Sequence, residues 1–161
     1  LRVRFPPLDD SDLAMRSFGM SEIILVASPA FTAAHGQPKA LADVGRMPTL
    51  SMGTVGKEHK WRFVDVDSNS TELIHSPSLA TDDLYTLRRA AVRGVGVACL
   101  PTLLIAEDLS SGILVRVLPS LSFRAGVLHA VFPSRRGMVP AVRALLDCLS
   151  EGFAANPLLA G

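Results

Sequence analysis

Hydrophobic residues recur along this chain with two periods, one typical of amphipathic helices and the other typical of buried strands. Both periods occur between residues 81 and 101. Leucines and alanines return at helical spacing from Leu84 to Ala91, whereas Val95–Leu100 is continuously apolar, as a parallel strand covered on both faces would be. Gly94 separates the two segments and suits the left-handed conformation that ends many helices. The pattern predicts a helix followed by a strand in an α/β domain.

Polar residues and prolines predict where these elements begin. Thr81 is a good N-cap, and Asp82 and Asp83 place negative charge at the positive end of the helix dipole. We therefore predict a helix over residues 82–93. Pro101 suits the first position of the helix that follows the apolar strand.

The same two periods divide the rest of the chain into short strands and helices. Strands are predicted at residues 1–5, 13–18, 22–28, 49–52, 61–66, 71–75, 113–117 and 127–132, with a turn at 19–21. Helices are predicted at residues 29–35, 41–45, 101–108 and from 140 onward, the last with an apolar stripe of Val142, Leu145, Leu146, Leu149 and Phe153. Trp61 and Phe63 belong to a hairpin outside the main sheet. They either line a ligand cleft or, in the reading we favour, pack on the domain.

Composition indicates a folded domain and excludes several classes of protein. Hydrophobic residues make up 48% of the 161 positions, too many for a disordered chain. The net charge of +1 provides no overall field for nucleic acid, so we do not expect this chain to bind DNA on its own. No apolar run reaches the roughly 18 residues that a membrane helix needs. Cys99 and Cys148 are predicted to be reduced, buried and apolar in role, which indicates the cytoplasm.

Reactive residue types do not form the patterns of metal, nucleophilic or nucleotide chemistry. The four histidines lack the close spacing of metal ligands: His35, His59, His75 and His129. Ser51-Met52-Gly53 follows a strand but lacks the preceding glycine of a nucleophile elbow. Gly94-Val95-Gly96 follows a helix, which reverses the order found in dinucleotide-binding loops. We therefore expect no cofactor, no metal and no enzymatic activity.

Small-molecule binding remains as the function that the strand ends suggest. In open α/β sheets, ligands lie beyond the carboxyl ends of strands and beside helix N-termini. The residues at such places are Phe5, Pro6, Ser51, Met52, Gly53, Thr81, Asp82, Pro101 and Thr102. Single residues have structural alternatives: Thr81 as a cap, Pro101 as a helix start and Gly53 as a turn.

Several segments, in their order along the chain, resemble the effector-binding domain of LysR-type transcriptional regulators. They are residues 13–16, 23–31, 35–38, 41–44, 61–63, 94–101, 107–109, 112–118 and 129–136. None of these segments is specific alone, but the ordered set covers nearly all of the sequence. The resemblance implies an α/β, periplasmic-binding-protein-like fold of two lobes, in which the candidate residues converge on a cleft that binds the effector.

The resemblance also implies how the chain is divided. Residues 1–28 are expected to form part of lobe one and a crossing strand, 29–120 a complete lobe two, and 121–161 the return crossing, a lobe-one strand and the C-terminal helix. Because the sequence opens within a strand and without methionine, we expect a fragment with lobe one truncated at its N-terminal side. Open edges and uncovered apolar faces would follow, and a second copy of the chain is the expected cover.

The implied function is to sense a small metabolite and relay the signal to a winged helix-turn-helix that lies outside this sequence. A homodimer or higher homo-oligomer is implied, with DNA contacted only through that missing domain and no membrane contact. Many relatives have asparagine where this chain has Asp82, and a carboxylate only accepts hydrogen bonds, so an effector near Asp82 is expected to present a donor. The alternative is a stand-alone or transport-linked solute-binding protein of the same fold type. Residues upstream of Leu1 would separate the two.

Overall fold

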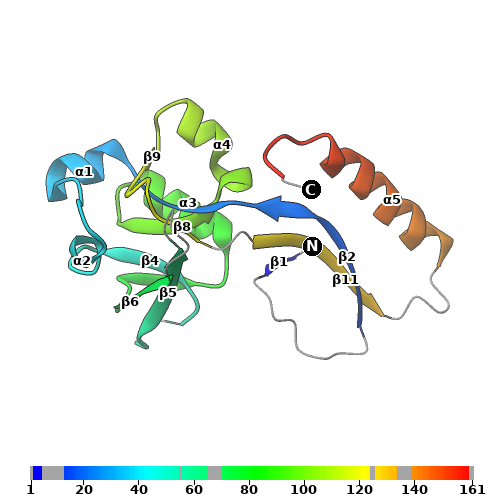
Figure 1. The fold of residues 1–161 in the computed structure, drawn as a ribbon, viewed down its shortest axis with the longest axis horizontal. Helices are drawn as coiled ribbons and strands as arrows, with labels where there is room; N and C mark the ends of the chain where they lie inside the picture. The colour runs from blue at the N-terminus through cyan, green and yellow to red at the C-terminus, as the bar shows by residue number, and fades with distance from the viewer. Residues whose placement is uncertain are drawn as a thin grey trace. The chain divides into compact units, whose positions relative to one another are not determined.

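The computed structural model describes residues 2–4, 13–54, 56–64, 70–123, 126–133 and 139–159. Internal contacts divide the chain into two compact units (Figure 1). Unit 1 comprises Leu1–Glu22 and Ala125–Gly161, and unit 2 comprises Ile23–Arg124. The chain therefore passes between the units at residues 22–23 and 124–125. The crossings predicted from the sequence were near residues 28 and 121. The interpretation of the units as two lobes stays a prediction.

Unit 2 contains a mixed sheet of five strands in the order β7-β4-β8-β3-β9. Its strands are β3 (Ile23–Ala27), β4 (Thr49–Met52), β7 (Leu79–Thr81), β8 (Val97–Pro101) and β9 (Val115–Arg116). β4 runs parallel to both β7 and β8, whereas β3 runs antiparallel to β8 and β9. Three strands therefore end at the same edge of the sheet, and this edge carries most of the predicted ligand residues.

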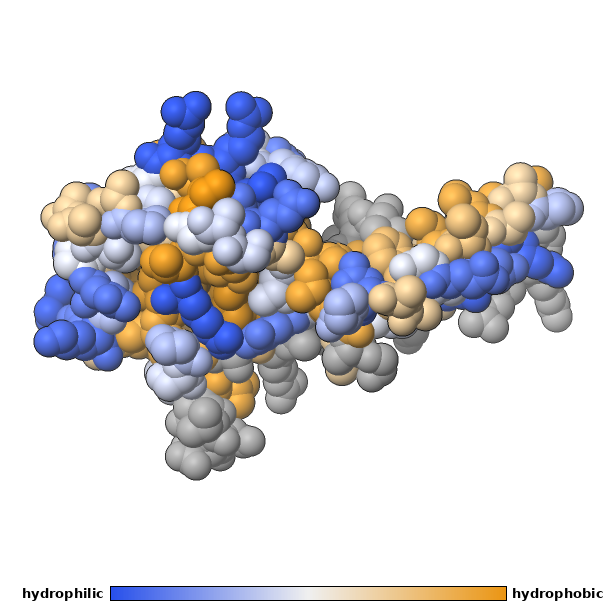
Figure 2. Space-filling model, turned by 90° about the horizontal axis from the view of Figure 1, so that it is seen from above, coloured by the Kyte–Doolittle hydropathy of each residue, from blue (hydrophilic) through white to orange (hydrophobic). Residues whose placement is uncertain are grey.

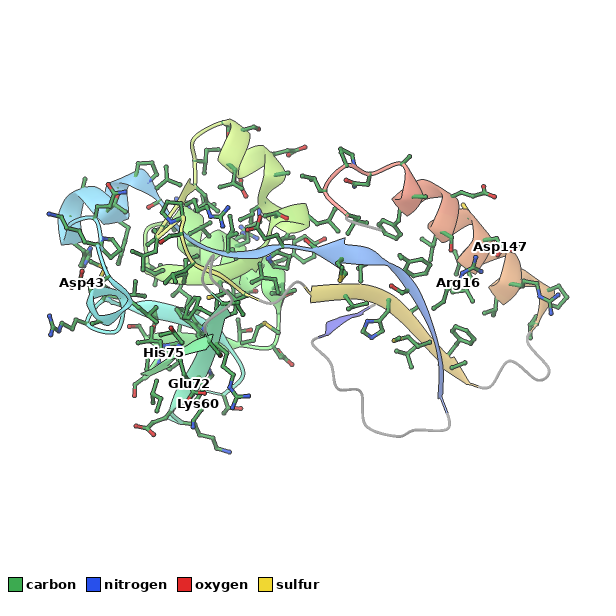
Figure 3. The ribbon with its side chains drawn as sticks, viewed as in Figure 1. Arg16, Asp43, Lys60, Glu72, His75 and Asp147 are labelled. Carbon is green, nitrogen blue, oxygen red and sulfur yellow. The ribbon has the colours of Figure 1, made fainter. Side chains whose placement is uncertain are left out.

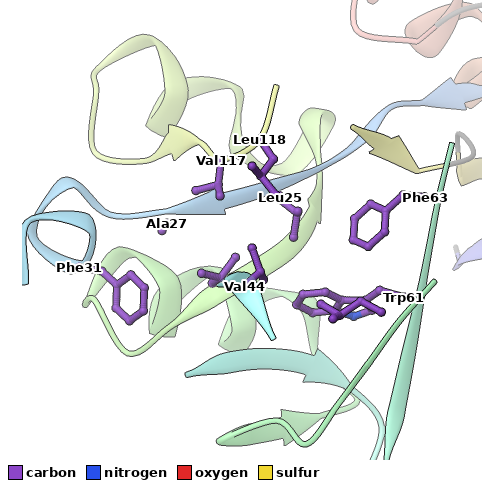
Figure 4. Close-up of a cluster of buried hydrophobic side chains, with 10 residues drawn as sticks. Leu25, Ala27, Phe31, Val44, Trp61, Phe63, Val117 and Leu118 are labelled. Atoms are coloured by element: carbon purple, nitrogen blue, oxygen red, sulfur yellow. The ribbon is translucent and has the colours of Figure 1, made fainter. Parts of the chain in front are cut away.

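Both faces of this sheet are covered, as the apolar strand sequences predicted. Along β3, Leu25 and Ala27 belong to one hydrophobic cluster, and Ile24 and Val26 belong to another. Because successive side chains of a strand point to opposite faces, the two clusters lie on opposite sides of the sheet. Figure 4 shows the first cluster, in which residues from β3 meet aromatic side chains from elsewhere in unit 2.

The aromatic side of the first cluster comes from a second, three-stranded sheet. Its order is β10-β5-β6, with β5 at His59–Val64, β6 at Ser70–His75 and β10 at Ser122–Phe123. The predicted hairpin outside the main sheet is confirmed. Trp61 and Phe63 are buried in the cluster with 6% and 0% exposure, so packing on the domain is confirmed over a role as exposed ligand stackers. β10 pairs with β5, within the segment predicted as the return crossing.

Four helices complete the described part of unit 2. They are α1 (Pro29–His35), α2 (Leu41–Val44), α3 (Leu84–Val92) and α4 (Thr102–Ser110). The second hydrophobic cluster joins α3 and α4 to the sheet through Leu87, Ala91 and Ile105. Phe31 of α1 and Val44 of α2 join the first cluster instead. The fold of unit 2 is thus a sheet between helices on one face and a hairpin with two short helices on the other.

The start of α3 corrects the predicted cap. Thr81 is not the N-cap, because it is the last residue of β7 and pairs with Met52 in the parallel ladder. Asp83 caps the helix instead: its carboxylate accepts hydrogen bonds from the backbone N–H groups of Tyr85 and Thr86 at 3.3 and 3.0 Å. Thr81 therefore belongs to the sheet, and the helix begins at Leu84, two residues after the predicted start.

The end of α3 confirms the predicted role of Gly94. Its φ is +75°, and its N–H donates to the carbonyl of Ala91, while the N–H of Val95 donates to the carbonyl of Ala90. These two bonds form a Schellman motif, which needs a left-handed residue. The N–H of Val95 is used in this motif and is not available to the sheet. The strand β8 therefore begins at Val97, two residues after the predicted start. Pro101 ends β8 and precedes α4, which begins at Thr102.

Position 96 requires a glycine, because the backbone of Pro48 lies too close to leave room for a side chain. A Cβ at this position would lie 2.6 Å from the carbonyl oxygen of Pro48. We expect Gly96→Ala to lower the free energy of unfolding by about 1–3 kcal/mol, because the clash is with backbone that cannot rotate away. Gly152→Ala is the matched control: it lies in a helix with nothing near its Cβ, and should stabilise by about 0.5–1 kcal/mol. Urea unfolding measures the free energy of unfolding of both variants, which should fall for Gly96→Ala and rise for Gly152→Ala.

Unit 1 contains a three-stranded antiparallel sheet and one helix. The sheet order is β1-β11-β2, with β1 at Arg2–Arg4, β2 at Leu13–Ser21 and β11 at Gly126–Pro133; the helix is α5, Pro140–Ala154. The predicted turn at residues 19–21 is wrong, because these residues continue β2 and pair with β11. The pairing register shifts between Leu128 and His129, which pair with Gly19 and Ser17, so Phe18 is the extra residue of a β-bulge. Arg16 and Asp147 join β2 to α5 by an ion pair of 2.6 Å (Figure 3).

The apolar stripe of α5 is only partly covered. Leu146 is buried with 5% exposure, whereas Leu145 and Val142 are 57% and 38% exposed. Figure 2 shows apolar residues gathered along one side of this region and hydrophilic residues along the other. Cys148 of the same helix is exposed, so the prediction that it is buried is wrong. It lies two positions after Leu146, on a different face of the helix.

Candidate ligand-binding edge of unit 2

The carboxyl ends of β4, β7 and β8 form the candidate site. Met52 pairs with Thr81 in the register of β4 and β7, and the N–H of Gly53 donates to the carbonyl of Thr81 at 3.0 Å. β8 continues beside β4 in the same direction, so Pro101 and Thr102 leave the sheet at the same edge. The helices α3 and α4 begin directly after β7 and β8. This edge has the geometry at which open α/β sheets bind ligands.

Seven of the nine predicted ligand residues lie at this edge, and they differ in accessibility. Met52, Gly53 and Asp82 are exposed, Thr81 and Thr102 are half-buried, and Ser51 and Pro101 are buried. The remaining two, Phe5 and Pro6, lie outside the described residues. Because Ser51 and Met52 are neighbours in a strand, their side chains point to opposite faces of the sheet. The exposed part of the edge is therefore built around Met52, Thr81 and Asp82.

The two aspartates after β7 have different roles. Asp83 caps the helix. Its carboxylate accepts hydrogen bonds from the hydroxyl and N–H of Thr86 and from the N–H of Tyr85, and these bonds hold the pKa of Asp83 below its ordinary value. Asp82 is exposed and makes no hydrogen bond or ion pair with any residue that the structure describes. The Oγ1 of Thr81 accepts the N–H of Asp83 at 3.2 Å, which leaves the hydroxyl proton of Thr81 able to donate.

The family model described as LysR substrate binding domain matches residues 1–154. The chain belongs to this family. Its sequence is 30% identical over 159 residues to the transcriptional regulator PtxR of Pseudomonas aeruginosa and 28% identical over 157 residues to CrgA of Neisseria meningitidis. These alignments cover 98% and 97% of this chain but 50% and 52% of the relatives. The LysR domain described here thus spans about half the length of these curated relatives.

Solved LysR-type structures share the fold. The structure of CrgA from Neisseria meningitidis matches with a TM-score of 0.80 at 28% identity, over 96% of this chain and 52% of that one. The regulatory domain of an AphB variant from Vibrio vulnificus matches with a TM-score of 0.75 at 26% identity, over 93% of this chain and 74% of that one. The fold is therefore the mixed α/β, periplasmic-binding-protein-like fold of LysR regulatory domains. The relatives are named as regulators, in agreement with the prediction of a non-enzymatic domain.

A histidine that the sequence analysis left unassigned organises the loop after β4. The Nδ1 of His59, in β5, lies 2.7 Å from the Oγ of Ser51, and its Nε2 lies 3.1 Å from the carbonyl oxygen of Thr54. The ring also packs on Gly53, since a Cβ there would lie 3.0 Å from the Cε1 of His59. No spacing rule pointed to this contact, because it depends on how the hairpin packs over the sheet.

A second histidine lies opposite the first in the hairpin. His75 pairs with His59 in the β5–β6 register, with ring centroids 6.0 Å apart. Its Nδ1 lies 2.7 Å from the Oγ1 of Thr49, and the centroid of its ring lies 4.0 Å from that of Trp61. Burial, and to a smaller extent the proximity of His59, lowers the pKa of His75 to about 4. His75 is therefore a neutral, buried side chain at neutral pH.

The described residues offer little for metal or thiol chemistry. Among them, no three histidine, cysteine or acidic side chains gather where they could hold a metal ion. Burial raises the pKa of the Cys99 thiol well above its ordinary value, which disfavours the reactive thiolate. Across the described parts of the chain, the helices are too short or too polar to span a bilayer.

Proposed function

We propose that this LysR domain senses a small effector at the carboxyl edge of β4, β7 and β8. The effector is a small molecule that binds one arrangement of the two units better than another, because only such a difference in affinity can shift a conformational equilibrium. The signal then passes to a DNA-binding segment outside this sequence. The family membership carries the proposal, together with the exposed Met52 and Asp82 and the half-buried Thr81 at the strand ends.

Several finer parts of the proposal come from the family resemblance. The two units act as hinged lobes, with lobe one completed by residues upstream of Leu1 and with Phe5 and Pro6 facing the same effector. The parent protein works in the cytoplasm. It assembles as a homodimer or higher homo-oligomer, in which a second copy covers the exposed apolar side chains of α5. The exposure of Leu145 and Val142 supports this assembly.

The test is a thermal-shift screen of the full-length parent with aromatic acids, amino acids and sugar acids. A compound that binds the folded state raises the melting temperature, and the rise grows with the logarithm of its concentration once that exceeds the dissociation constant. The expected result is at least one compound whose stabilising effect requires residues at the strand ends. A full screen without any stabilising compound would contradict the proposal.

Asp82→Asn is expected to weaken binding of a donor-bearing effector by roughly tenfold or more. The substitution removes the charge that strengthens the hydrogen bond, and bonds to charged groups contribute about 1.5–3 kcal/mol. Isothermal titration calorimetry of the full-length parent with the compound identified above measures the change. Glu151→Gln, an exposed carboxylate on α5, is the control and should leave affinity unchanged. Equal affinity of wild type and Asp82→Asn would remove Asp82 from the site.

A further inference from the structure

We propose that His59 is a positioning residue that withdraws the Ser51 hydroxyl from the effector and thereby selects an effector that presents a hydrogen-bond donor, an ammonium or hydroxyl group, over a carboxylate. The inference rests on the proposed function and specifies the chemistry of the same site. It starts from the two hydrogen bonds of the His59 ring, which connect β4 to the loop that follows it.

The neighbours of His59 determine which ring nitrogen carries the proton. The carbonyl oxygen of Thr54 can only accept, so the Nε2 at 3.1 Å from it must donate. In the neutral ring the Nδ1 is then an acceptor, and the Ser51 hydroxyl 2.7 Å away donates its proton to it. Ser51 therefore has no proton left for a ligand.

The Ser51 side chain is also buried beside His59. Its exposure is 5%, and its side chain points toward the hairpin that carries His59. Met52 points to the opposite face, where its partner in the parallel register is Thr81. The ring of His59 also holds Gly53, whose φ is +125° and whose N–H is fixed to the carbonyl of Thr81. These contacts fix the loop in a conformation in which Met52 is exposed and Ser51 is buried.

Thr81 and Asp82 present polar groups at the exposed edge. The Asp82 carboxylate only accepts hydrogen bonds and carries a negative charge, so it attracts a donor and repels a carboxylate. The Thr81 hydroxyl can still donate, while the 44% exposed Met52 offers an apolar contact. Together these groups fit an effector with an apolar body and an ammonium or hydroxyl group.

The test compares three probes of similar size and different polarity: n-butylammonium, 1-butanol and butyrate. Each is titrated into the isotope-labelled 161-residue chain, and changes in backbone amide signals of residues 52–54 and 82–83 report binding at the edge. We expect butylammonium and butanol to move these signals, and butyrate to bind at least fivefold more weakly than butylammonium. A spectrum that correlates ring protons and nitrogens should place the proton of His59 on Nε2.

Two variants of His59 separate positioning from simple loss of stability. His59→Phe keeps an aromatic ring but removes the acceptor of the Ser51 hydroxyl, so the Ser51 proton becomes available to a carboxylate and the ratio of butylammonium to butyrate affinity should fall at least threefold. His59→Asn keeps an acceptor for the Ser51 hydroxyl and should retain the ratio. A purely structural role would change the melting temperature of either variant while leaving the affinity ratio as in the wild type.

The outcomes distinguish this inference from the proposed function. If butyrate moves the edge signals as strongly as butylammonium, or if His59→Phe leaves the ratio unchanged, the site stands and the role of His59 is overturned. A proton on Nδ1 of His59 also overturns that role. If no probe moves the edge signals, both the role of His59 and the site itself are overturned.

Discussion

Arg88→Met is expected to lower the free energy of unfolding of unit 2 by about 3 kcal/mol. Arg88 of α3 binds both carboxylate oxygens of Asp108 in α4, with Nε 2.5 Å from Oδ2 and Nη2 2.8 Å from Oδ1. The Asp108 side chain is 6% exposed, so removing the guanidinium leaves a buried carboxylate without its partner. Such losses cost about 3–5 kcal/mol, and the 30% exposure of the Arg88 side chain places this pair at the lower end.

Urea unfolding followed by fluorescence measures this loss. Trp61 is the single tryptophan of the sequence and is buried in unit 2, so its emission reports the unit that contains the ion pair. Arg89→Met, an exposed neighbour on the same helix, should change stability by less than about 0.5 kcal/mol. The double variant Arg88→Met with Asp108→Leu should recover most of the loss, because it removes the buried charge as well. Equal effects of the Arg88 and Arg89 variants would contradict the prediction.

The stability of unit 2 is expected to fall by about 2–3 kcal/mol as the pH drops from 7 to 4, because of His75. Its pKa is about 4 in the folded chain and near the ordinary 6.5 when unfolded. Between these values the unfolded chain binds a proton that the folded chain does not, so unfolding becomes easier as the pH falls. The contribution is complete above pH 6.5 and is lost progressively down to about pH 4.

Denaturant unfolding by circular dichroism at several pH values tests this slope. In His75→Asn the part of the slope due to His75 should vanish, whatever the stability of the variant at pH 7. His35→Asn, which replaces an exposed histidine at the end of α1, should keep the wild-type slope. The prediction fails if His75→Asn and the wild type lose stability equally over this range.

Local sequence signals predicted the end of α3 better than its start. Gly94 ends α3 because its backbone conformation is a local property that a glycine allows and other residues resist. The start of α3 depended on a competition: Thr81 can cap a helix, but its pairing with Met52 in the sheet prevailed and Asp83 became the cap. That outcome depends on a strand about thirty positions earlier in the chain, which no local pattern contains.

The candidate site shows the same division between local and nonlocal information. The end of β4 at Met52 was predicted, because buried strands have a recognisable composition. The strand β7, which ends at Thr81, was not predicted, because three residues are too few for a periodic pattern. The contact between His59 and Ser51 could not be predicted, because it requires the packing of the hairpin on the sheet. The exposure of Cys148 likewise depends on which face of α5 meets unit 1, and helical periodicity alone does not determine that.

Hydrogen–deuterium exchange of the full-length parent, with and without the compound found by thermal shift, tests the central claim most directly. That claim is that an effector binds where β4, β7 and β8 end. We predict that the bound compound slows exchange of the backbone amides at residues 52–54, 82–86 and 102–104. Unchanged exchange in all three segments, with protection confined to other parts of the chain, would contradict the account.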